Sequence, residues 1–88
     1  MVEQKVKITN PTGLHLRPAG IFCQEAMKYT SKIIFRYGLN CEANAKSVLS
    51  VLGACIKSGD EIVIVCDGED EQVALDSLVA LVENGFEE

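Results

Sequence analysis

The only histidine of the chain, His15, lies beside residues that could bind an anion. Arg17 follows two positions later, and Pro18 is typical of the first turn of a helix, where its missing N–H costs nothing. Such a turn carries unpaired N–H groups and partial positive charge, which favour anions. The same field disfavours imidazolium, so more of the ring is neutral and nucleophilic. A guanidinium can hydrogen-bond two phosphate oxygens. Together these residues indicate a group that receives a phosphoryl group and passes it on.

A surface histidine that only caps the helix is the simpler interpretation of His15, and the residue types alone leave it open. No acidic residue close in sequence could orient the imidazole, and no cysteine is paired with it by spacing. Residues 67–71 lack the ligand spacing and the distal glutamate of a calcium loop. The chain also lacks a GxxxxGK[ST] nucleotide loop. A calcium loop and a nucleotide loop are therefore excluded.

The elements that must position these residues follow from hydropathy patterns. Alternation predicts strands over 2–8, 32–37 and 41–43, and a short β-branched run predicts an interior strand over 61–66. Helical spacing predicts helices from 16 to near 29, over 47–56, and from the acids at 69–71 to near 84. The order β-α-β-β-α-β-α predicts a two-layer α+β domain over residues 1–88, with three helices on one face of the sheet.

Composition excludes several classes of protein. The chain has 88 residues, 48% of them hydrophobic and 24% charged, which suits one small globular domain and is too apolar for disorder. All eight Lys and Arg lie in residues 1–57, while residues 58–88 hold most of the acids and the net charge is −5. This balance argues against direct nucleic-acid binding, although the basic half could meet an acidic protein partner. The longest apolar run, 62–66, is far too short to span a bilayer, and we expect a cytoplasmic protein without membrane insertion.

The cysteines are predicted to be reduced and mostly buried. No two of them form a CxxC pair, and one histidine is too few for a usual zinc site. Free cysteines in such a chain usually behave as small hydrophobic residues. The four are Cys23, Cys41, Cys55 and Cys66.

Two motifs resemble those of a known family. Residues 13–19, GLHLRPA, resemble the active-site signature of the histidine-containing phosphocarrier protein (HPr) family of the bacterial sugar phosphotransferase system. Residues 44–49, NAKSVL, are similar to the family's second motif, in which Ser47 takes the place of the regulatory serine. The resemblance extends over essentially the whole chain, and the two motifs at this separation are highly specific.

The resemblance implies an open-faced β-sandwich with an antiparallel sheet of order 1-4-2-3. It implies that His15 accepts a phosphoryl group on Nδ1 from phosphorylated Enzyme I and donates it to IIA domains of sugar permeases, while Arg17 pairs with the phosphate. It also implies that Ser47 is the target of HPr kinase/phosphorylase in bacteria that possess this enzyme. We expect a monomer that needs no cofactor and no metal.

The short helix after Ser47 has more apolar residues than one core-facing side requires, and an exposed apolar patch is typical of an interaction surface. Val51 and Val48 are also candidates for the core. The resemblance implies a partner-docking patch made of Leu16, Gly20, Val48, Leu49 and Leu52. The chain departs from common family members at Leu16, at Gly20, and at Cys55, where glycine is frequent. These departures leave open the alternative that the chain is a specialised paralogue of the family.

Two other functions stay open. One is a regulatory module that binds a transcriptional regulator after phosphorylation of Ser47. The presence of His15 argues against a purely regulatory role, because the family's regulatory paralogue lacks that histidine. The other is a small-ligand or metal-binding α+β module, for which the sequence lacks paired cysteines or a ligand loop.

Overall fold

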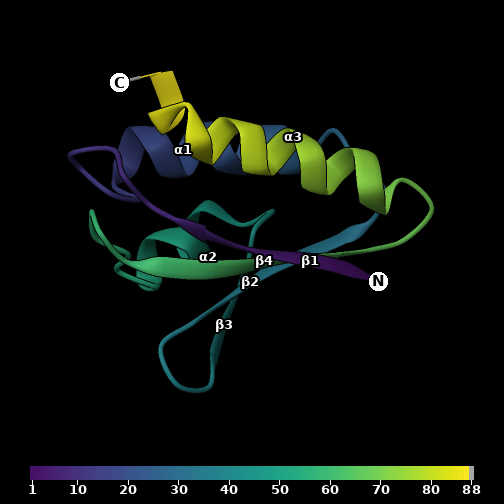
Figure 1. Cartoon of the computed structure of the whole chain (residues 1–88), viewed down its shortest axis with the longest axis horizontal. Coiled ribbons are helices and arrows are strands. Elements are labelled where there is room, and N and C mark those ends of the chain that lie inside the picture. Colours follow the sequence, from purple (N-terminus) through teal and green to yellow (C-terminus); the bar gives the residue numbers. More distant parts are fainter. Residues whose placement is uncertain (88) are drawn as a thin grey trace.

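The computed structural model describes residues 1–87, over which four strands and three α-helices form two layers (Figure 1). The sheet is antiparallel throughout, with the order β1-β4-β2-β3. The predicted element order and α+β class are confirmed, and the strand order is the one that the resemblance implied. The elements are β1 (Val2–Lys7), α1 (Leu16–Ala26), β2 (Lys32–Tyr37), β3 (Cys41–Asn44), α2 (Val48–Gly53), β4 (Glu61–Asp67) and α3 (Glu71–Glu83), followed by a 3₁₀ turn at Gly85–Glu87.

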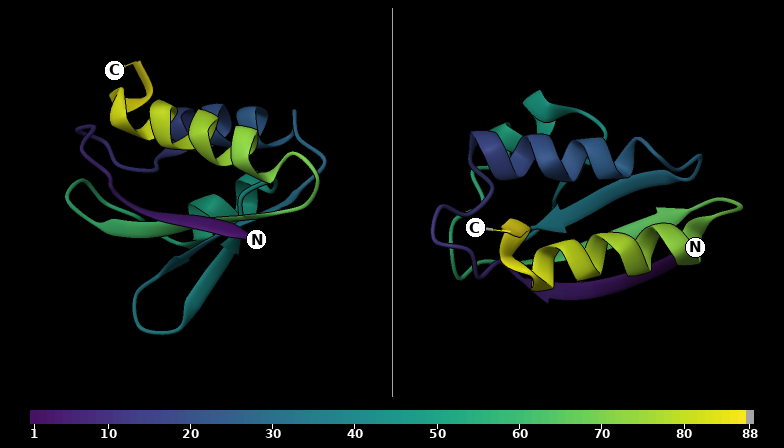
Figure 2. Two further views of the ribbon diagram at one scale, coloured as in Figure 1. Left: turned by 45° about the vertical axis from the view of Figure 1, so that its right-hand side comes forward. Right: turned by 90° about the horizontal axis from the view of Figure 1, so that it is seen from above.

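Helices α1 and α3 lie side by side over one face of the sheet, as Figure 1 and the right-hand view of Figure 2 both show. The shorter α2 packs against α1 and β3. The start of α1 and the whole of α2 lie toward the same end of the molecule (Figure 1). This arrangement brings two segments that are far apart in the sequence, and that carry the two motifs, to one region.

The core lies between the sheet and the helices. In the sheet, Val6 of β1 lies opposite Ile62 of β4, and both are buried. The aromatic ring of Phe22 on α1 meets that of Phe35 on β2 edge-on, with ring centroids 5.9 Å apart. Phe86, beyond the end of α3, adds a third buried ring at 6.3 Å from Phe22. No sequence pattern predicted the contribution of Phe86, which depends on a left-handed backbone (φ 55°) after α3.

The second helix is shorter than the sequence predicted, because it ends at Gly53 rather than at Ile56. Cys55 adopts a left-handed conformation (φ 54°), which cannot continue a right-handed helix. The N–H of Cys55 instead donates to the carbonyl oxygen of Leu52, three residues back, at 3.1 Å. The left-handed residue stands where the family frequently has glycine, the residue that adopts this conformation without strain.

The first helix also ends early, at Ala26 rather than near Tyr29. The chain after it is bound by Asp70, the residue before α3. The carboxylate of Asp70 accepts the N–H of Thr30 at 2.9 Å, the N–H of Ser31 at 3.0 Å and the hydroxyl of Ser31. The bonds from Ser31 and Thr30 lower the pKa of Asp70 from 3.8 to about 2. A contact from a distant segment therefore holds the end of this loop, just before β2.

The prediction of mostly buried cysteines is wrong for two of the four. Cys23 and Cys66 are buried, whereas Cys41 and Cys55 are exposed, and all four are free. Burial raises the pKa of the Cys66 thiol to about 11, so this side chain behaves as a small hydrophobic residue. Cys41 begins a short edge strand and Cys55 follows α2, so neither faces the core.

Candidate functional site

A tightly packed loop positions His15 at the start of α1. The N–H of Leu14, which is buried, donates to the carbonyl oxygen of Ile56 at 3.0 Å. The side-chain amide of Asn10 donates to the carbonyl oxygen of Gly13 at 2.8 Å. Gly13 has φ +66°, and a Cβ built on it would lie 2.6 Å from that same Ile56 oxygen. Only glycine fits here, so the loop holds the backbone of His15 against the segment that follows α2.

His15 occupies the N-cap position of α1, but its side chain does not cap the helix. Its backbone is extended (φ −80°, ψ −171°), and its carbonyl oxygen accepts the N–H of Ala19 at 2.8 Å. The exposed imidazole makes no capping hydrogen bond. The interpretation of His15 as a capping side chain is therefore wrong, and the ring is available for chemistry.

The first turn of α1 offers an anion site next to that ring. Leu16 and Arg17 are the first two helical residues, so their N–H groups have no acceptor within the helix, and the third residue, Pro18, has no N–H. The exposed side chain of Arg17 forms no ion pair with any residue in the described range 1–87. Two N–H groups and a guanidinium can thus bind the oxygens of a phosphoryl group attached to the imidazole.

Ser47 occupies the N-cap position of α2. Its hydroxyl oxygen accepts the N–H of Ser50 at 3.2 Å, and its carbonyl oxygen accepts the N–H of Val51 at 3.0 Å. The residue is half-buried, and its backbone N–H donates to the carbonyl oxygen of Asn44 at 3.1 Å. A negative group attached to this oxygen could therefore still accept a hydrogen bond from the N–H of Ser50 at the start of α2.

The residues of the implied docking patch differ in exposure. Leu16 is 65% exposed and Leu49 is 83% exposed. Val48 and Leu52 are half-buried, and Leu52 packs against the core. Gly20 has nothing within 4 Å of the position of a Cβ. Because α1 packs against α2, these residues belong to one region, in which Leu16 and Leu49 supply the accessible apolar surface.

A hollow of about 310 Å³ joins the loop before α1 to the segment after α2. The sequence did not predict it, because its two sides are 40 residues apart in the chain. In the sequence, Cys55 was distinguished only as a departure from the family, and Lys57 lies outside both motifs. The residues that line the hollow are Thr12, Leu14, His15, Leu52, Cys55, Ile56 and Lys57.

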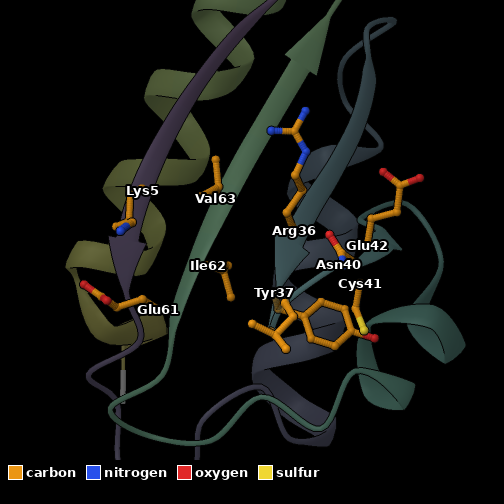
Figure 3. A pocket seen from close by; sticks show the side chains of 11 residues that line it. Lys5, Arg36, Tyr37, Asn40, Cys41, Glu42, Glu61, Ile62 and Val63 are labelled. Carbon is orange, nitrogen blue, oxygen red and sulfur yellow. The ribbon is translucent and has the colours of Figure 1, made fainter.

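A larger hollow, of about 560 Å³, lies on the face of the sheet that the helices leave open (Figure 3). Figure 3 shows Lys5 and Glu61 on one side of it and Arg36 and Glu42 on the other. The guanidinium of Arg36 also lies 3.3 Å from the carboxylate of Glu3. Charges of both signs alternate here, so the surface favours neither an anion nor a cation.

Among the described residues 1–87, no group of three or more His, Cys, Asp or Glu side chains could hold a metal ion. No helix within those residues combines the length and the apolar character needed to cross a membrane.

Comparison with known proteins gives consistent matches over almost the whole chain. Residues 2–84 match the family model described as the PTS HPr component phosphorylation site. The HPr-like protein Crh of Bacillus subtilis is 40% identical over 83 residues, covering 94% of this chain and 96% of Crh. The phosphocarrier protein HPr of Treponema pallidum is 36% identical over 88 residues, covering 100% of this chain and 99% of that protein. A crystal structure of HPr from Thermoanaerobacter tengcongensis superposes with a TM-score of 0.96 at 38% identity, covering 100% and 98% of the two chains.

One structural match conflicts with the expectation of a monomer. A crystal structure of Bacillus subtilis Crh, described as an intertwined dimer with a swapped domain, superposes with a TM-score of 0.76 at 39% identity, covering 97% of each chain. A similar chain therefore forms a dimer, and similarity to relatives does not support a monomer here.

Proposed function

The chain belongs to the HPr family of phosphocarrier proteins of the phosphotransferase system, and on that premise we propose that His15 carries a phosphoryl group from phosphorylated Enzyme I to IIA domains of sugar permeases. Residues 1–88 act in this proposal as one phosphocarrier domain of the cytoplasm. The observation that carries it is an exposed imidazole at the start of α1 that makes no capping hydrogen bond.

The transfer is an exchange of one bond to phosphorus for another. The lone pair of Nδ1 of neutral His15 forms the new bond to phosphorus, and the bond to the donor group breaks, so its electron pair returns to the donor. Transfer to a IIA domain repeats the exchange with His15 as the leaving group. The chain is regenerated at each cycle, which makes it a phosphorylated intermediate that other proteins turn over.

Arg17 stabilises the charge on the phosphoryl group. The exposed guanidinium forms no ion pair within residues 1–87, so its charge is available to phosphate oxygens, and the N–H groups of Leu16 and Arg17 add two donors. Because the phosphoryl group stays accessible at the surface, a second protein can remove it without any opening of the fold.

The apolar surface around Leu16 and Leu49 docks the partners in this proposal. Both side chains are more than half exposed, and an exposed apolar patch beside a reactive group is typical of a protein-binding surface. Gly20, Val48 and Leu52 complete the surface, although the two larger side chains among them are half-buried.

Ser47 is a regulatory phosphorylation site in this proposal, in an organism that has HPr kinase/phosphorylase. Its hydroxyl lies at the start of α2, two residues before the exposed Leu49. A phosphate there places about two negative charges beside the docking surface.

A second candidate function is a mainly regulatory one, in which phosphorylated Ser47 is recognised by a transcriptional regulator. The similarity to Crh, an HPr-like protein, favours this candidate. The two functions differ in whether His15 accepts a phosphoryl group.

The deciding experiment incubates the chain with Enzyme I and phosphoenolpyruvate and measures its mass. We expect an acid-labile addition of one phosphate, which is absent from a folded His15→Ala variant and retained by Ser47→Ala. Full phosphorylation of the His15→Ala variant would refute the assignment. A wild-type chain that never gains phosphate, although Enzyme I phosphorylates a known HPr in the same assay, would favour the regulatory candidate.

A further inference from the structure

We propose that Lys57 supplies a second cation to the phosphoryl group on His15, in addition to Arg17. This inference rests on the proposed phosphocarrier function and adds a binding residue from outside both sequence motifs. Lys57 follows α2, whereas His15 precedes α1, yet both line the hollow of about 310 Å³.

The backbone of Lys57 is fixed next to the loop that carries His15. A Cβ built on Gly13 would lie only 2.8 Å from the Cα of Lys57, and Gly13 is two residues from His15. The N–H of Lys57 donates to the carboxylate of Asp60 at 2.9 Å, and the N–H of Asp60 donates to the carbonyl oxygen of Lys57 at 3.0 Å. The lysine side chain therefore extends from a rigid turn whose place beside the loop is set by packing.

The ammonium group of Lys57 is not neutralised by its surroundings. It forms no ion pair within the described residues 1–87, and the carboxylate of Asp60 is bonded to the backbone of this turn. Of the described residues that line the hollow, none is acidic, and Leu52 and Ile56 make part of its wall apolar. Among the described residues that line the hollow, an anion attached to His15 would thus meet a positive charge and no negative one.

The arrangement gives the phosphoryl group cations from two elements. Arg17 and the N–H groups belong to the first turn of α1, while Lys57 belongs to the segment between α2 and β4. Attraction between exposed charges amounts to a few tenths up to about 1 kcal/mol, which corresponds to a two- to fivefold change in an equilibrium constant. Because these charges are exposed, salt should weaken the effect.

The test measures the equilibrium between phosphoenolpyruvate and the phosphorylated chain, at catalytic amounts of Enzyme I. This equilibrium constant depends only on the free and phosphorylated states, so weaker docking to Enzyme I cannot change it. The variants are Lys57→Met, which removes the charge, and Lys57→Arg, which keeps it. Lys5→Met is the matched control, since Lys5 lies on the open face of the sheet (Figure 3). Circular dichroism verifies that each variant is folded.

We expect Lys57→Met to lower the equilibrium constant two- to fivefold at low salt, and the difference to vanish in about 1 M salt, where the screening length is about 3 Å. Lys57→Arg and Lys5→Met should match the wild type. A Lys57→Met variant with the wild-type equilibrium constant at low salt overturns the inference and leaves the phosphocarrier function standing. The same holds if the equilibrium constant of Lys57→Arg is as low as that of Lys57→Met. A wild-type chain that accepts no phosphoryl group at all overturns the proposed function first, and this inference with it.

Discussion

Changes at Ser47 should separate the stability of α2 from the docking of Enzyme I. The hydroxyl oxygen of Ser47 accepts the N–H of Ser50 at 3.2 Å, and this bond caps a helix of only six residues. Ser47→Ala removes the acceptor. Ser47→Asp keeps an acceptor at the same position and adds a negative charge, because aspartate is as good an N-cap residue as serine.

The loss of such a cap costs about 1 kcal/mol. In a chain of 88 residues, about 1 kcal/mol lowers the melting temperature by about 4–8 °C. We therefore expect Ser47→Ala to melt about 4–8 °C below the wild type and Ser47→Asp to melt at or slightly above it. Ser58→Ala, in an exposed turn, is the matched control and should melt as the wild type does.

The docking of Enzyme I should be weakened by Ser47→Asp, the variant that keeps the stability of α2. The added charge of Ser47→Asp lies two residues from Leu49, which is 83% exposed. It must lose water or meet acidic partner residues when Enzyme I docks, so we expect KM for the chain to rise about two- to fivefold at low salt. The rise should shrink as salt is added, and phosphoserine, with more charge, should have a larger effect.

The assays are thermal unfolding followed by circular dichroism and steady-state phosphorylation of the chain by Enzyme I. A Ser47→Ala variant that melts with the wild type would show that the cap contributes nothing. A Ser47→Asp variant that melts markedly earlier, yet is phosphorylated on His15 as readily as the wild type, would refute the whole argument about charge and docking.

Three further predictions concern other residues. Arg17→Ala should slow phosphoryl transfer by about one to two decades, since a charge-assisted hydrogen bond contributes about 1.5–3 kcal/mol, and unchanged rates in a quenched-flow assay would make Arg17 a bystander. Cys55→Gly should raise the free energy of unfolding in urea by about 0.5–1 kcal/mol, because glycine relieves the left-handed strain (φ 54°) at some entropic cost, whereas Cys55→Ala should not raise it. Since the pKa of Asp70 is lowered to about 2, its contribution to stability is present above about pH 4 and is lost as pH falls toward 2; Asp70→Asn should therefore show a flatter dependence of unfolding free energy on pH over that range, and an unchanged slope would contradict this origin.

The sequence by itself determined the order of strands and helices and the candidate chemistry of the site. Strands and helices have different hydrophobic periods, and these depend only on neighbours a few residues away. His15, Arg17 and Pro18 are likewise adjacent in the chain, so their joint position at the start of a helix follows from local sequence.

Only the tertiary structure decided which distant residues meet. Helix α2 ends where Cys55 adopts a left-handed conformation. Helix α1 is followed by a loop that is held by Asp70. Neither feature alters a local hydrophobic pattern, so neither could be predicted from one. The sequence also could not predict which cysteines are buried, because burial depends on how the elements pack.

The hollow beside His15 is the clearest case. Its walls come from the loop before α1 and from the segment after α2, and they meet because the N–H of Leu14 bonds to Ile56 and because Gly13 packs against the backbone of Lys57. Local periodicity carries no information about such contacts, since they depend on chain segments brought together only when the sheet and helices assemble. The position of His15 at the start of a helix thus follows from the local sequence, whereas Lys57 lines the same hollow only because the fold brings it there.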